Sequence, residues 1–280
     1  MKKLLFTGGT GFIGRNVIPM LRENFDVHSP GRQELNLKDE IAVREYLSRE
    51  CFDIVIHSAN PNPEKNELDQ KNYMLEDSLR IFMNFYAARN CFEKILFLGS
   101  GAEYDKTMEI CSIHEDQCFR SIPKDIYGFS KYIMNSLASS SRNVYNICLF
   151  GCYGPTDHHT KFITHCIRCC LRDEPITIRQ DCRFDYYHVY DLARMMIWLI
   201  ENEPNHHIYN ACSGERVLLS EIAEEVKTQM GSRHPIKILK SGLNREYTAS
   251  NERFVKESGL YPKISLKEGI AMQIEWEKEN

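Results

Sequence analysis

A tyrosine and a lysine one helical turn apart are the residues of this chain best suited to acid–base chemistry. Tyr127 and Lys131 form a YxxxK pair at the start of a predicted helix, and this spacing places both side chains on one face. The neighbouring ammonium favours the phenolate over the phenol, which lets a tyrosine exchange a proton at neutral pH. Ser100 follows a short apolar strand, where a hydroxyl can hydrogen-bond a substrate oxygen as charge develops on it. Together the three residues predict proton transfer at an alcohol or a carbonyl, although each alone is common on a helix surface or in a loop.

Three glycines near the amino terminus predict a dinucleotide cofactor. They follow a predicted strand and open a predicted helix with the spacing GxxGxxG. The tight turn, the close approach of a pyrophosphate and the packing of helix on strand all require the absence of a Cβ, and the helix N-terminus offers free N–H groups to phosphates. The alternative is a plain tight turn. The expected cofactor contacts in this loop are Gly8, Thr10, Gly11, Phe12, Ile13 and Gly14.

The residue that follows the second strand indicates which dinucleotide is bound. Proteins that bind NAD usually place an Asp or Glu there, which accepts a hydrogen bond from the ribose 2′-hydroxyl. Here the first charged residue beyond the strand Asp26–His28 is Arg32, whose charge and planar donor fork suit a 2′-phosphate. We therefore expect NADP(H). NAD(H) is the alternative, because Arg32 also fits a solvated loop.

Strands and helices that alternate along the first two thirds of the chain would position these residues. The expected strands are Lys3–Thr7, Asp26–His28, Asp53–His57, Lys94–Ser100 and Asn146–Phe150. The expected helices are Gly14–Asn24, Asp39–Glu50, Leu75–Asn90 and Lys124–Ser139. This alternation predicts the α/β class, with a doubly wound parallel Rossmann sheet that binds ligands at the carboxyl ends of its strands.

The pattern loosens after residue 155, which suggests a second, smaller α/β lobe for the substrate. A strand at Tyr186–Val189 and a helix at Val189–Glu201 are expected to return to the sheet. The later expected elements are the helices Leu219–Gln229 and Leu266–Glu277 and the strand Ile236–Leu239. We expect residues 1–160 and 184–212 to form the dinucleotide-binding domain, and residues 161–183 and 213–280 to form the substrate-binding lobe.

Composition excludes several classes of partner. A net charge of −4 over 280 residues gives no electrostatic reason to expect nucleic acid or an anionic membrane. The apolar run at the start is too short for a signal peptide, and no stretch approaches the roughly 18 apolar residues of a spanning helix. We expect a cytoplasmic protein with reduced thiols, although it has eleven cysteines.

One cysteine-rich segment needs a separate interpretation. Cys166 and Cys169 have the spacing of a metal-ligand pair, but a second pair is missing, and loop or surface positions account for His158, His159 and His165. The segment Phe162–Leu171 has the pattern of an amphipathic helix, in which cysteine is a small buried residue. We therefore expect no metal.

Taken together, these motifs resemble the extended short-chain dehydrogenase/reductases, the sugar-nucleotide epimerase/dehydratase family. The resemblance covers nearly the whole chain, and within the family it is greatest to the GDP-fucose synthases. The stretches that carry it are the TGGTGFIG loop, Gly31–Leu37, Asp53–Ala59, Asn84, Lys94–Ser100, Tyr104, YGFSK, Tyr153–Pro155, His188–Ala193, Asn210, Gly214 and Ile264–Leu266.

The resemblance assigns roles to residues of this chain. It implies that Tyr127 shuttles a proton, that Lys131 holds the ribose hydroxyls, and that Ser100 shares the substrate oxygen. It implies NADPH, with Arg32 at the 2′-phosphate. Asn36, Leu37, His57 and Ala59 are implied as further cofactor contacts. It also implies a homodimer formed through the helices Leu75–Asn90 and Lys124–Ser139.

Departures from the family pattern narrow the reaction. The GDP-fucose synthases epimerise their sugar with a cysteine and a histidine, and these positions hold Ala102 and Lys161 here. Alanine cannot move a proton, which favours simple reduction over coupled epimerisation and reduction. A 4,6-dehydratase is disfavoured because Gly101 and Ala102 stand where its acid and base would follow the serine, with Glu103 one place late.

The substrate contacts are less well defined by the sequence. Lys161, Arg183 and Arg245 are candidate contacts for the diphosphate, and surface positions are the alternative for each. Relatives place an arginine where this chain has Phe184, and often an asparagine where it has Gly151.

These features rank three hypotheses for the function. The leading one is NADPH-dependent reduction of a 4-keto nucleotide-diphosphate sugar, either a deoxy sugar or a heptose. The alternatives are an NAD-dependent sugar-nucleotide 4-epimerase and a cofactor-binding regulator without catalysis.

Overall fold

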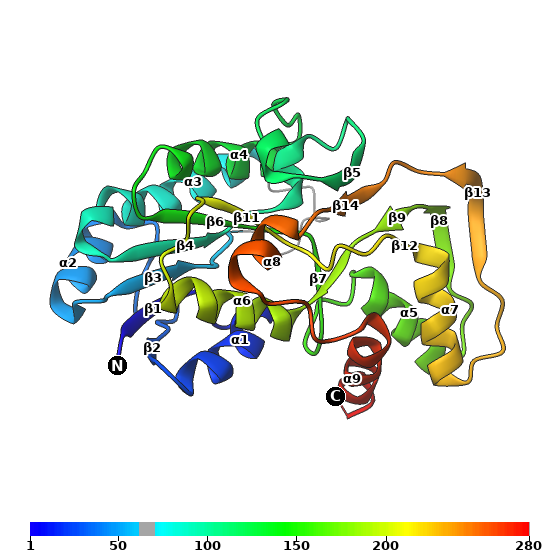
Figure 1. Ribbon diagram of the computed structural model, residues 1–280. Coiled ribbons are helices and arrows are strands. Elements are labelled where there is room, and N and C mark those ends of the chain that lie inside the picture. The colour runs from blue at the N-terminus through cyan, green and yellow to red at the C-terminus, as the bar shows by residue number, and fades with distance from the viewer. Residues whose placement is uncertain (62–70, 280) are drawn as a thin grey trace. The chain divides into compact units, whose positions relative to one another are not determined.

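The computed structural model describes residues 1–61 and 71–279 (Figure 1). The chain forms two compact units, each with its own hydrophobic core. The first unit contains residues 1–107, 115–149 and 193–209, and the second contains residues 108–114, 150–192 and 210–280.

A six-stranded sheet forms the centre of the first unit. Its order is β11 (Ile208–Ala211), β6 (Val144–Leu149), β4 (Lys94–Leu98), β3 (Ile54–His57), β1 (Lys3–Thr7) and β2 (Asp26–His28). The five strands from β6 to β2 run parallel. The strand order reverses between β1 and β3, since β1 is followed in the chain by β2 on one side and pairs with β3 on the other. Such a switch point opens a ligand crevice at the carboxyl ends of the strands.

Helices cover both faces of this sheet. In Figure 1, α2 (Glu40–Glu50), α3 (Lys71–Ala87) and α4 (Ile126–Ser139) lie on one face, and α1 (Phe12–Arg22) and α6 (Val189–Glu201) on the other. The α2–α4 face is sealed by apolar residues such as Phe82, Phe85 and Phe97, all fully buried. Burial of both faces explains the continuous apolar runs of the inner strands, such as residues 54–56 in β3 and 95–98 in β4. The predicted α/β doubly wound fold is therefore confirmed.

Several helix boundaries differ from the sequence expectation: α3 covers Lys71–Ala87 rather than Leu75–Asn90, and the starts of α1 and α4 differ for local reasons. The helix α1 begins at Phe12 rather than Gly14, directly after the glycine turn. The helix α4 begins at Ile126 rather than Lys124, because the Asp125 side chain accepts a hydrogen bond from Gly128 N at 2.8 Å and acts as the N-cap. Short 3-10 helices lie in the connections of the described residues, at Arg89–Cys91, Gly101–Tyr104 and Glu115–Gln117.

The second unit has three small sheets. A four-stranded sheet has the order β12 (Val217–Leu218), β9 (Arg183–Phe184), β14 (Tyr247–Ala249) and β5 (Ile110–Ile113). Two-stranded sheets pair β10 (Tyr186–His188) with β7 (Gly151–Tyr153) and β13 (Lys237–Leu243) with β8 (Thr177–Asp181). The helices are α5 (Phe162–Leu171), α7 (Leu219–Met230), α8 (Glu252–Ser258) and α9 (Leu266–Glu279).

The cysteine-rich segment lies in the core of this second unit. On α5, Cys166 and Cys169 pack with Ile163 and Ile167 in a cluster that also takes residues from α7 and α9. Burial raises the pKa of the Cys166 thiol far above its ordinary value, so this thiol stays protonated. The described residues contain no cluster of three or more candidate metal ligands.

The two units divide the chain differently from the expected domains. Residues 108–114, 150–160, 184–192 and 210–212 belong to the second unit instead of the dinucleotide-binding domain. The physical reason is strand pairing: β5 pairs with β14, and β7 pairs with β10, so both leave the first unit. Local patterning cannot reveal such pairings, because their partners are distant in sequence.

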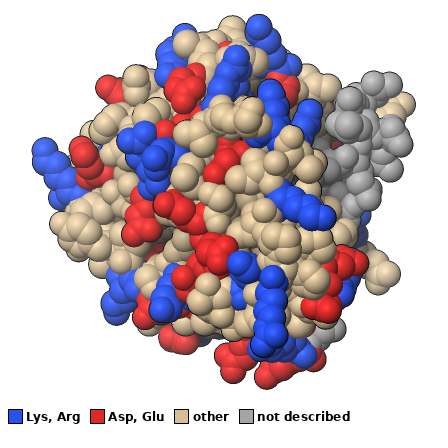
Figure 2. Space-filling view, turned by 90° about the vertical axis from the view of Figure 1, so that its right-hand side faces the viewer, with Lys and Arg blue, Asp and Glu red and all other residues tan. Residues whose placement is uncertain are grey.

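The surface matches the modest net charge. On the face drawn in Figure 2, basic and acidic side chains are interspersed over the coloured residues. Within the described parts of the chain, no helix has the length and apolar character needed to cross a bilayer.

Candidate active site

The glycine loop lies between β1 and α1 and has no room for side chains at two positions. Gly8 has a φ of +78°, and a Cβ there would come within 2.9 Å of the Ala59 backbone nitrogen. A Cβ at Gly14 would lie 2.5 Å from the Gly9 carbonyl oxygen. The Gly11 N–H closes the turn on the Gly8 carbonyl at 3.1 Å. The turn therefore provides the close backbone approach and the helix N-terminus that a pyrophosphate requires.

Thr7 and His57, at the ends of β1 and β3, contact each other next to this loop. The Thr7 hydroxyl lies 3.2 Å from His57 Nδ1 and accepts the Ala59 N–H at 3.2 Å, which joins the ends of β1 and β3. The His57 ring packs against Phe82 and Phe85, and its Nε2 is buried without a hydrogen-bond partner in the described structure. Burial, with a smaller contribution from Lys131, lowers the pKa of His57 to about 3, so the ring is neutral.

The neutral, buried His57 predicts a specific loss of stability in acid. Its pKa falls from 6.5 to about 3 on folding, so its contribution is fully present above pH 6.5 and is lost as the pH falls toward 3. We expect His57→Asn to flatten the pH dependence of the unfolding free energy between pH 6 and 4 by about 1.4 kcal/mol per pH unit. Urea unfolding at a series of pH values measures this slope, and His206→Asn, at an exposed histidine, should leave it unchanged.

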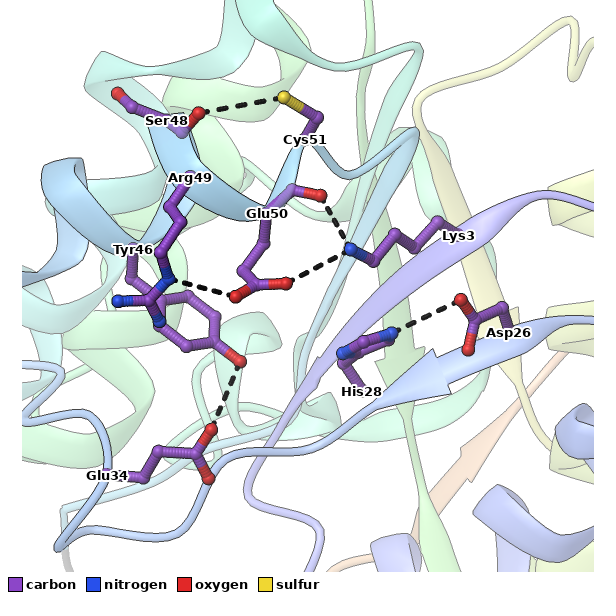
Figure 3. Close-up of polar contacts among 9 residues, drawn as sticks. All are labelled: Lys3, Asp26, His28, Glu34, Tyr46, Ser48, Arg49, Glu50 and Cys51. Carbon is purple, nitrogen blue, oxygen red and sulfur yellow. Dashed lines mark hydrogen bonds and ion pairs between the residues drawn. The ribbon is translucent and has the colours of Figure 1, made fainter.

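The segment that carries Arg32 is anchored by its neighbours. The Glu34 and Leu35 N–H groups donate to the Gly31 carbonyl at 3.0 and 2.9 Å and form a turn. Figure 3 shows the Tyr46 hydroxyl reaching Glu34 Oε1 at 3.5 Å. The Arg32 side chain is exposed, so it projects from an anchored turn. An exposed side chain here fits both alternatives left open by the sequence, a contact to a 2′-phosphate and a solvated loop arginine.

A network of charges joins the end of α2 to the start of β1. Lys3 on β1 donates to the Glu50 carbonyl at 2.7 Å and to its carboxylate at 3.1 Å, and Arg49 contacts the same carboxylate at 3.0 Å (Figure 3). These contacts account for the lowered pKa of Glu50. The two remaining cofactor candidates of this region lie just before α2: Asn36 is exposed, and the Leu37 carbonyl accepts a hydrogen bond from Asn84 at 2.8 Å.

The predicted catalytic residues gather at the carboxyl end of β4. Lys131 is buried on α4, and its Nζ donates to the Leu98 carbonyl at 2.7 Å, two residues before Ser100. The same Nζ lies 5.9 Å from the centroid of the Tyr127 ring. Ser100 is buried directly after β4 and begins the 3-10 helix Gly101–Tyr104, where its hydroxyl accepts the Ala102 N–H at 3.3 Å. This placement suits the reduction of a ketone, in which the Tyr127 phenol protonates the ketone oxygen and the Ser100 hydroxyl donates a hydrogen bond to it.

The candidate diphosphate residues lie in the second unit. Lys161 precedes α5 as its N-cap residue, and its side chain is exposed. Arg183 lies on β9, where its guanidinium donates to the Arg216 carbonyl at 3.2 Å. Arg245 lies two residues before β14, the strand that pairs with β9. The structure thus places Arg183 on β9 and Arg245 just before β14, the strand that pairs with β9, and Lys161 at a different element.

Phe184 and Gly151 have a shared structural explanation. The Phe184 ring lies 4.9 Å from that of Tyr247 and 5.0 Å from that of Tyr186. A Cβ at position 151 would come within 2.6 Å of the Phe184 ring and 2.5 Å of the Asp185 carbonyl oxygen. The phenylalanine therefore packs into this unit, and the glycine makes room for it.

Four polar residues near the site were given no role from the sequence. Thr7 joins the two strand ends, and Glu103, Asn135 and Asn146 form a buried cluster behind Ser100. One of them had a readable signal, because Ser100 and Glu103 have the S-x-x-E spacing of a capping box. The contacts of Asn135 and Asn146 depend on the tertiary fold, so no local signal exists.

Comparisons with known proteins agree with this geometry. Residues 4–212 match the NAD dependent epimerase/dehydratase family. This range is most of the chain, which therefore belongs to that family. The family predicted from the motifs is confirmed, as is the broader class of an NAD(P)-dependent oxidoreductase or epimerase.

Individual relatives span both reaction types. The chain is 26% identical to a dTDP-4-dehydro-6-deoxyglucose reductase from Escherichia coli over 95% of each protein. It is 24% identical to a UDP-glucose 4-epimerase from Corynebacterium glutamicum over 93% of this chain and 91% of that protein. The solved structure of a GDP-L-fucose synthetase from Naegleria fowleri, bound to NADP, has a TM-score of 0.86 at 16% identity and covers 100% of this chain and 94% of that chain. This last likeness concerns the fold.

Proposed function

We propose that this protein reduces a 4-keto nucleotide-diphosphate sugar with NADPH. The observation that carries the proposal is the convergence of Ser100, Tyr127 and Lys131 at the end of β4, in the same unit as the glycine loop. The long likeness to a 4-keto-sugar reductase supports it. Ala102 supports reduction without epimerisation, because a methyl group stands where the GDP-fucose synthases have their cysteine.

The residues of the first unit fit a dinucleotide. Gly8 and Gly14 leave no space for a Cβ, and the backbone at the start of α1, which begins at Phe12, is open to a pyrophosphate. Arg32 would contact the 2′-phosphate. The other proposed contacts to the cofactor are Asn36, Leu37, His57 and Ala59. When bound, the nicotinamide supplies a hydride to the keto carbon.

The protein's own groups then handle the proton and the substrate oxygen. The Tyr127 hydroxyl donates its proton to the carbonyl oxygen as negative charge develops there. The Ser100 hydroxyl donates a second hydrogen bond to that oxygen. Lys131 holds the ribose hydroxyls and stabilises the phenolate until solvent restores the proton. We assign the sugar nucleotide to the second unit, with Lys161, Arg183 and Arg245 as diphosphate contacts.

Incubation with a panel of sugar nucleotides tests this proposal. Each is first converted to its 4-keto form by a 4,6-dehydratase, and the panel includes deoxy sugars and heptoses on several nucleobases. We expect NADPH oxidation equal to the amount of product, and a mass gain of two hydrogens by mass spectrometry. Conversion of an unoxidised sugar nucleotide to its C4 epimer, without net NADPH use, would instead support the NAD-dependent 4-epimerase, which the relative from Corynebacterium glutamicum favours.

The choice of cofactor gives a separate prediction. Arg32→Ala should weaken NADPH binding by roughly 10- to 100-fold, because a charge-assisted contact to phosphate contributes about 1.5–3 kcal/mol. NADH binding should change little, since NADH has no 2′-phosphate. Fluorescence titration of the two cofactors measures both constants. Equal loss for NADPH and NADH would show that Arg32 acts on the loop rather than on the phosphate.

Two further properties complete the proposal. We propose a homodimer formed through α3 and α4, which pack together and expose apolar residues such as Tyr73 and Met83 on α3. We also propose a reducing, cytoplasmic compartment, which is supported by eleven cysteines that all carry free thiols.

A further inference from the structure

A fully buried carboxylate lies three residues after the catalytic serine. Glu103 has no solvent exposure, and its Oε1 accepts the Ser100 backbone N–H at 2.7 Å. Its Oε2 accepts the Asn135 side-chain amide at 2.7 Å and the Asn146 side-chain amide at 2.9 Å. Each carboxylate oxygen therefore has a protein donor. Burial of a carboxylate without such donors would be strongly unfavourable, so these hydrogen bonds are what allow Glu103 to remain in the core.

The donors come from the elements that carry the active site. Asn135 lies one turn beyond Lys131 on α4, and Lys131 lies one turn beyond Tyr127. The three residues therefore share one face of the helix. Through its two oxygens, Glu103 joins the backbone of Ser100 to the helix that bears the tyrosine and the lysine. Asn146 ties the same carboxylate to β6, which pairs with β4, the strand that precedes Ser100.

The cluster of Glu103, Asn135 and Asn146 is tightly packed against the backbone. A Cβ at Gly99 would overlap both Asn146 Oδ1 and Glu103 Oε1, so the cluster lies directly against the chain at the end of β4. The Oδ1 atoms of Asn135 and Asn146 are buried without a hydrogen-bond partner in the described structure, because both side chains turn their Nδ2 groups to the carboxylate. The two side-chain amides thus leave their Oδ1 acceptors without a donor while their Nδ2 groups bind Glu103.

Several titratable groups face this carboxylate. Lys131 faces it from α4, Cys118 Sγ lies 3.8 Å from Oε2, and Tyr104 is on the same 3-10 helix. Burial raises the pKa of Glu103 to about 7, against the opposing effects of the Ser100 and Asn146 donors, Lys131 and Asn135. Burial and the carboxylate keep Cys118 a neutral thiol, since both raise its pKa. Lys131 is thus the cation that faces Glu103 in this group.

We propose that Glu103 is a positioning residue for the reaction: it holds Ser100 in register with the Tyr127–Lys131 face of α4 through Asn135. The inference rests on the proposed function, because it assigns a role within the same site. Glu103 does not touch substrate; it acts by fixing the backbone from which the Ser100 hydroxyl projects. A shift of about 1 Å in a catalytic group can cost on the order of 100-fold in rate.

Two variants break this connection in different ways, and a third is a matched control. Glu103→Gln keeps the shape but replaces one acceptor with a donor, which must then face the Ser100 N–H or the two asparagine amides. Asn135→Ala removes the link from Glu103 to α4, together with a contact from the same amide to Cys118 Sγ at 3.0 Å. The control is Asn143→Ala, which also removes a side-chain amide with two hydrogen bonds, to the Arg89 and Phe92 carbonyls at 2.8 and 2.9 Å. Asn143 directly precedes β6, at the other end of the strand from the site.

The kinetic readouts separate positioning from plain stability. We expect both site variants to lower kcat by roughly 10- to 100-fold while KM for NADPH changes less than about 2-fold. In the wild type, kcat should fall as the pH drops through about 7, where protonation removes an acceptor, and Glu103→Gln should lack this acidic limb. Asn143→Ala should keep the wild-type kcat and pH profile. If the two site variants match Asn143→Ala in kcat and pH profile and differ only in melting temperature, the proposal is wrong.

Hydrogen exchange keeps the inference testable on its own. The Ser100 N–H is bonded to Glu103, so its exchange should be at least about 10-fold faster in Glu103→Gln than in Asn143→Ala. If Glu103→Gln fails to fold, Asn135→Ala supplies the same comparison, with exchange measured over the Ser100 turn and α4. If the wild type reduces no sugar nucleotide, the proposed function fails, while unchanged exchange at Ser100 would overturn the positioning role separately.

Discussion

Tyr127→Phe should lower kcat for ketone reduction by roughly 10²- to 10⁴-fold, the usual contribution of a positioned acid–base group. The substitution removes only the hydroxyl that donates the proton. The ring near Lys131 Nζ remains, so the binding constant for NADPH should change little. The rate is followed by NADPH absorbance with a 4-keto sugar nucleotide, and the binding constant by fluorescence titration.

A second tyrosine on the same helix supplies the control. Tyr132 packs its ring edge-on against Phe119 at 5.3 Å, and Tyr132→Phe should retain the wild-type rate. If Tyr127→Phe were as active as Tyr132→Phe, the acid–base assignment would fail. If neither the wild type nor any variant had activity although NADPH bound, the regulator without catalysis would become the better hypothesis.

Gly14→Ala should abolish useful cofactor binding, with NADPH affinity lower by about 100-fold or more, which corresponds to about 2.7 kcal/mol. The new Cβ would meet the carbonyl oxygen and carbonyl carbon of Gly9 at 2.5 and 2.6 Å, and neither is the movable end of a side chain. The glycine turn must therefore shift away from the phosphates. Overpacking of this kind also lowers the unfolding free energy by about 1–3 kcal/mol. Fluorescence titration and urea unfolding measure the two effects.

The matched substitution is Gly31→Ala, where a Cβ would have no neighbour within 4 Å. Its unfolding free energy should stay within about 0.5 kcal/mol of the wild type. Equal NADPH affinity in the wild type and in Gly14→Ala would show that the turn tolerates a side chain, and the phosphate-binding role of the loop would then be lost.

The parts of the fold that depend on local patterning were predictable. The strands Lys3–Thr7 and Asp26–His28 and the helices Phe162–Leu171 and Val189–Glu201 have the same bounds in the structure as in the sequence expectation. Their apolar spacing and flanking residues act within a few positions of the chain. The doubly wound sheet followed from the alternation of such elements, because right-handed crossovers leave few other arrangements.

The parts that depend on distant contacts were not predictable. Nothing near Ile110 indicates that its strand pairs with Tyr247, and nothing near Asn135 or Asn146 indicates that both amides meet one carboxylate. The candidate catalytic set could be proposed from the sequence because tyrosine and lysine lie one helix turn apart and the serine follows a strand. The residues that hold them in place come from three separate elements, and a single sequence does not show which side chains meet across a core.

The pairing of β5 with β14 also bears on how the chain is made. Ile110 and Ile113 are buried, and their strand pairs with β14, which lies much later in the sequence. The Ser112 N–H donates to the Thr248 hydroxyl, 136 positions further along the chain. At typical synthesis rates, a ribosome needs on the order of ten seconds to reach that partner. During this time the nascent β5 has an unpaired edge and two apolar side chains without cover, a state prone to mispairing. We therefore expect premature termination before residue 247 to yield aggregation-prone fragments, even when every residue of the glycine loop and of the Ser100, Tyr127 and Lys131 set has already been translated.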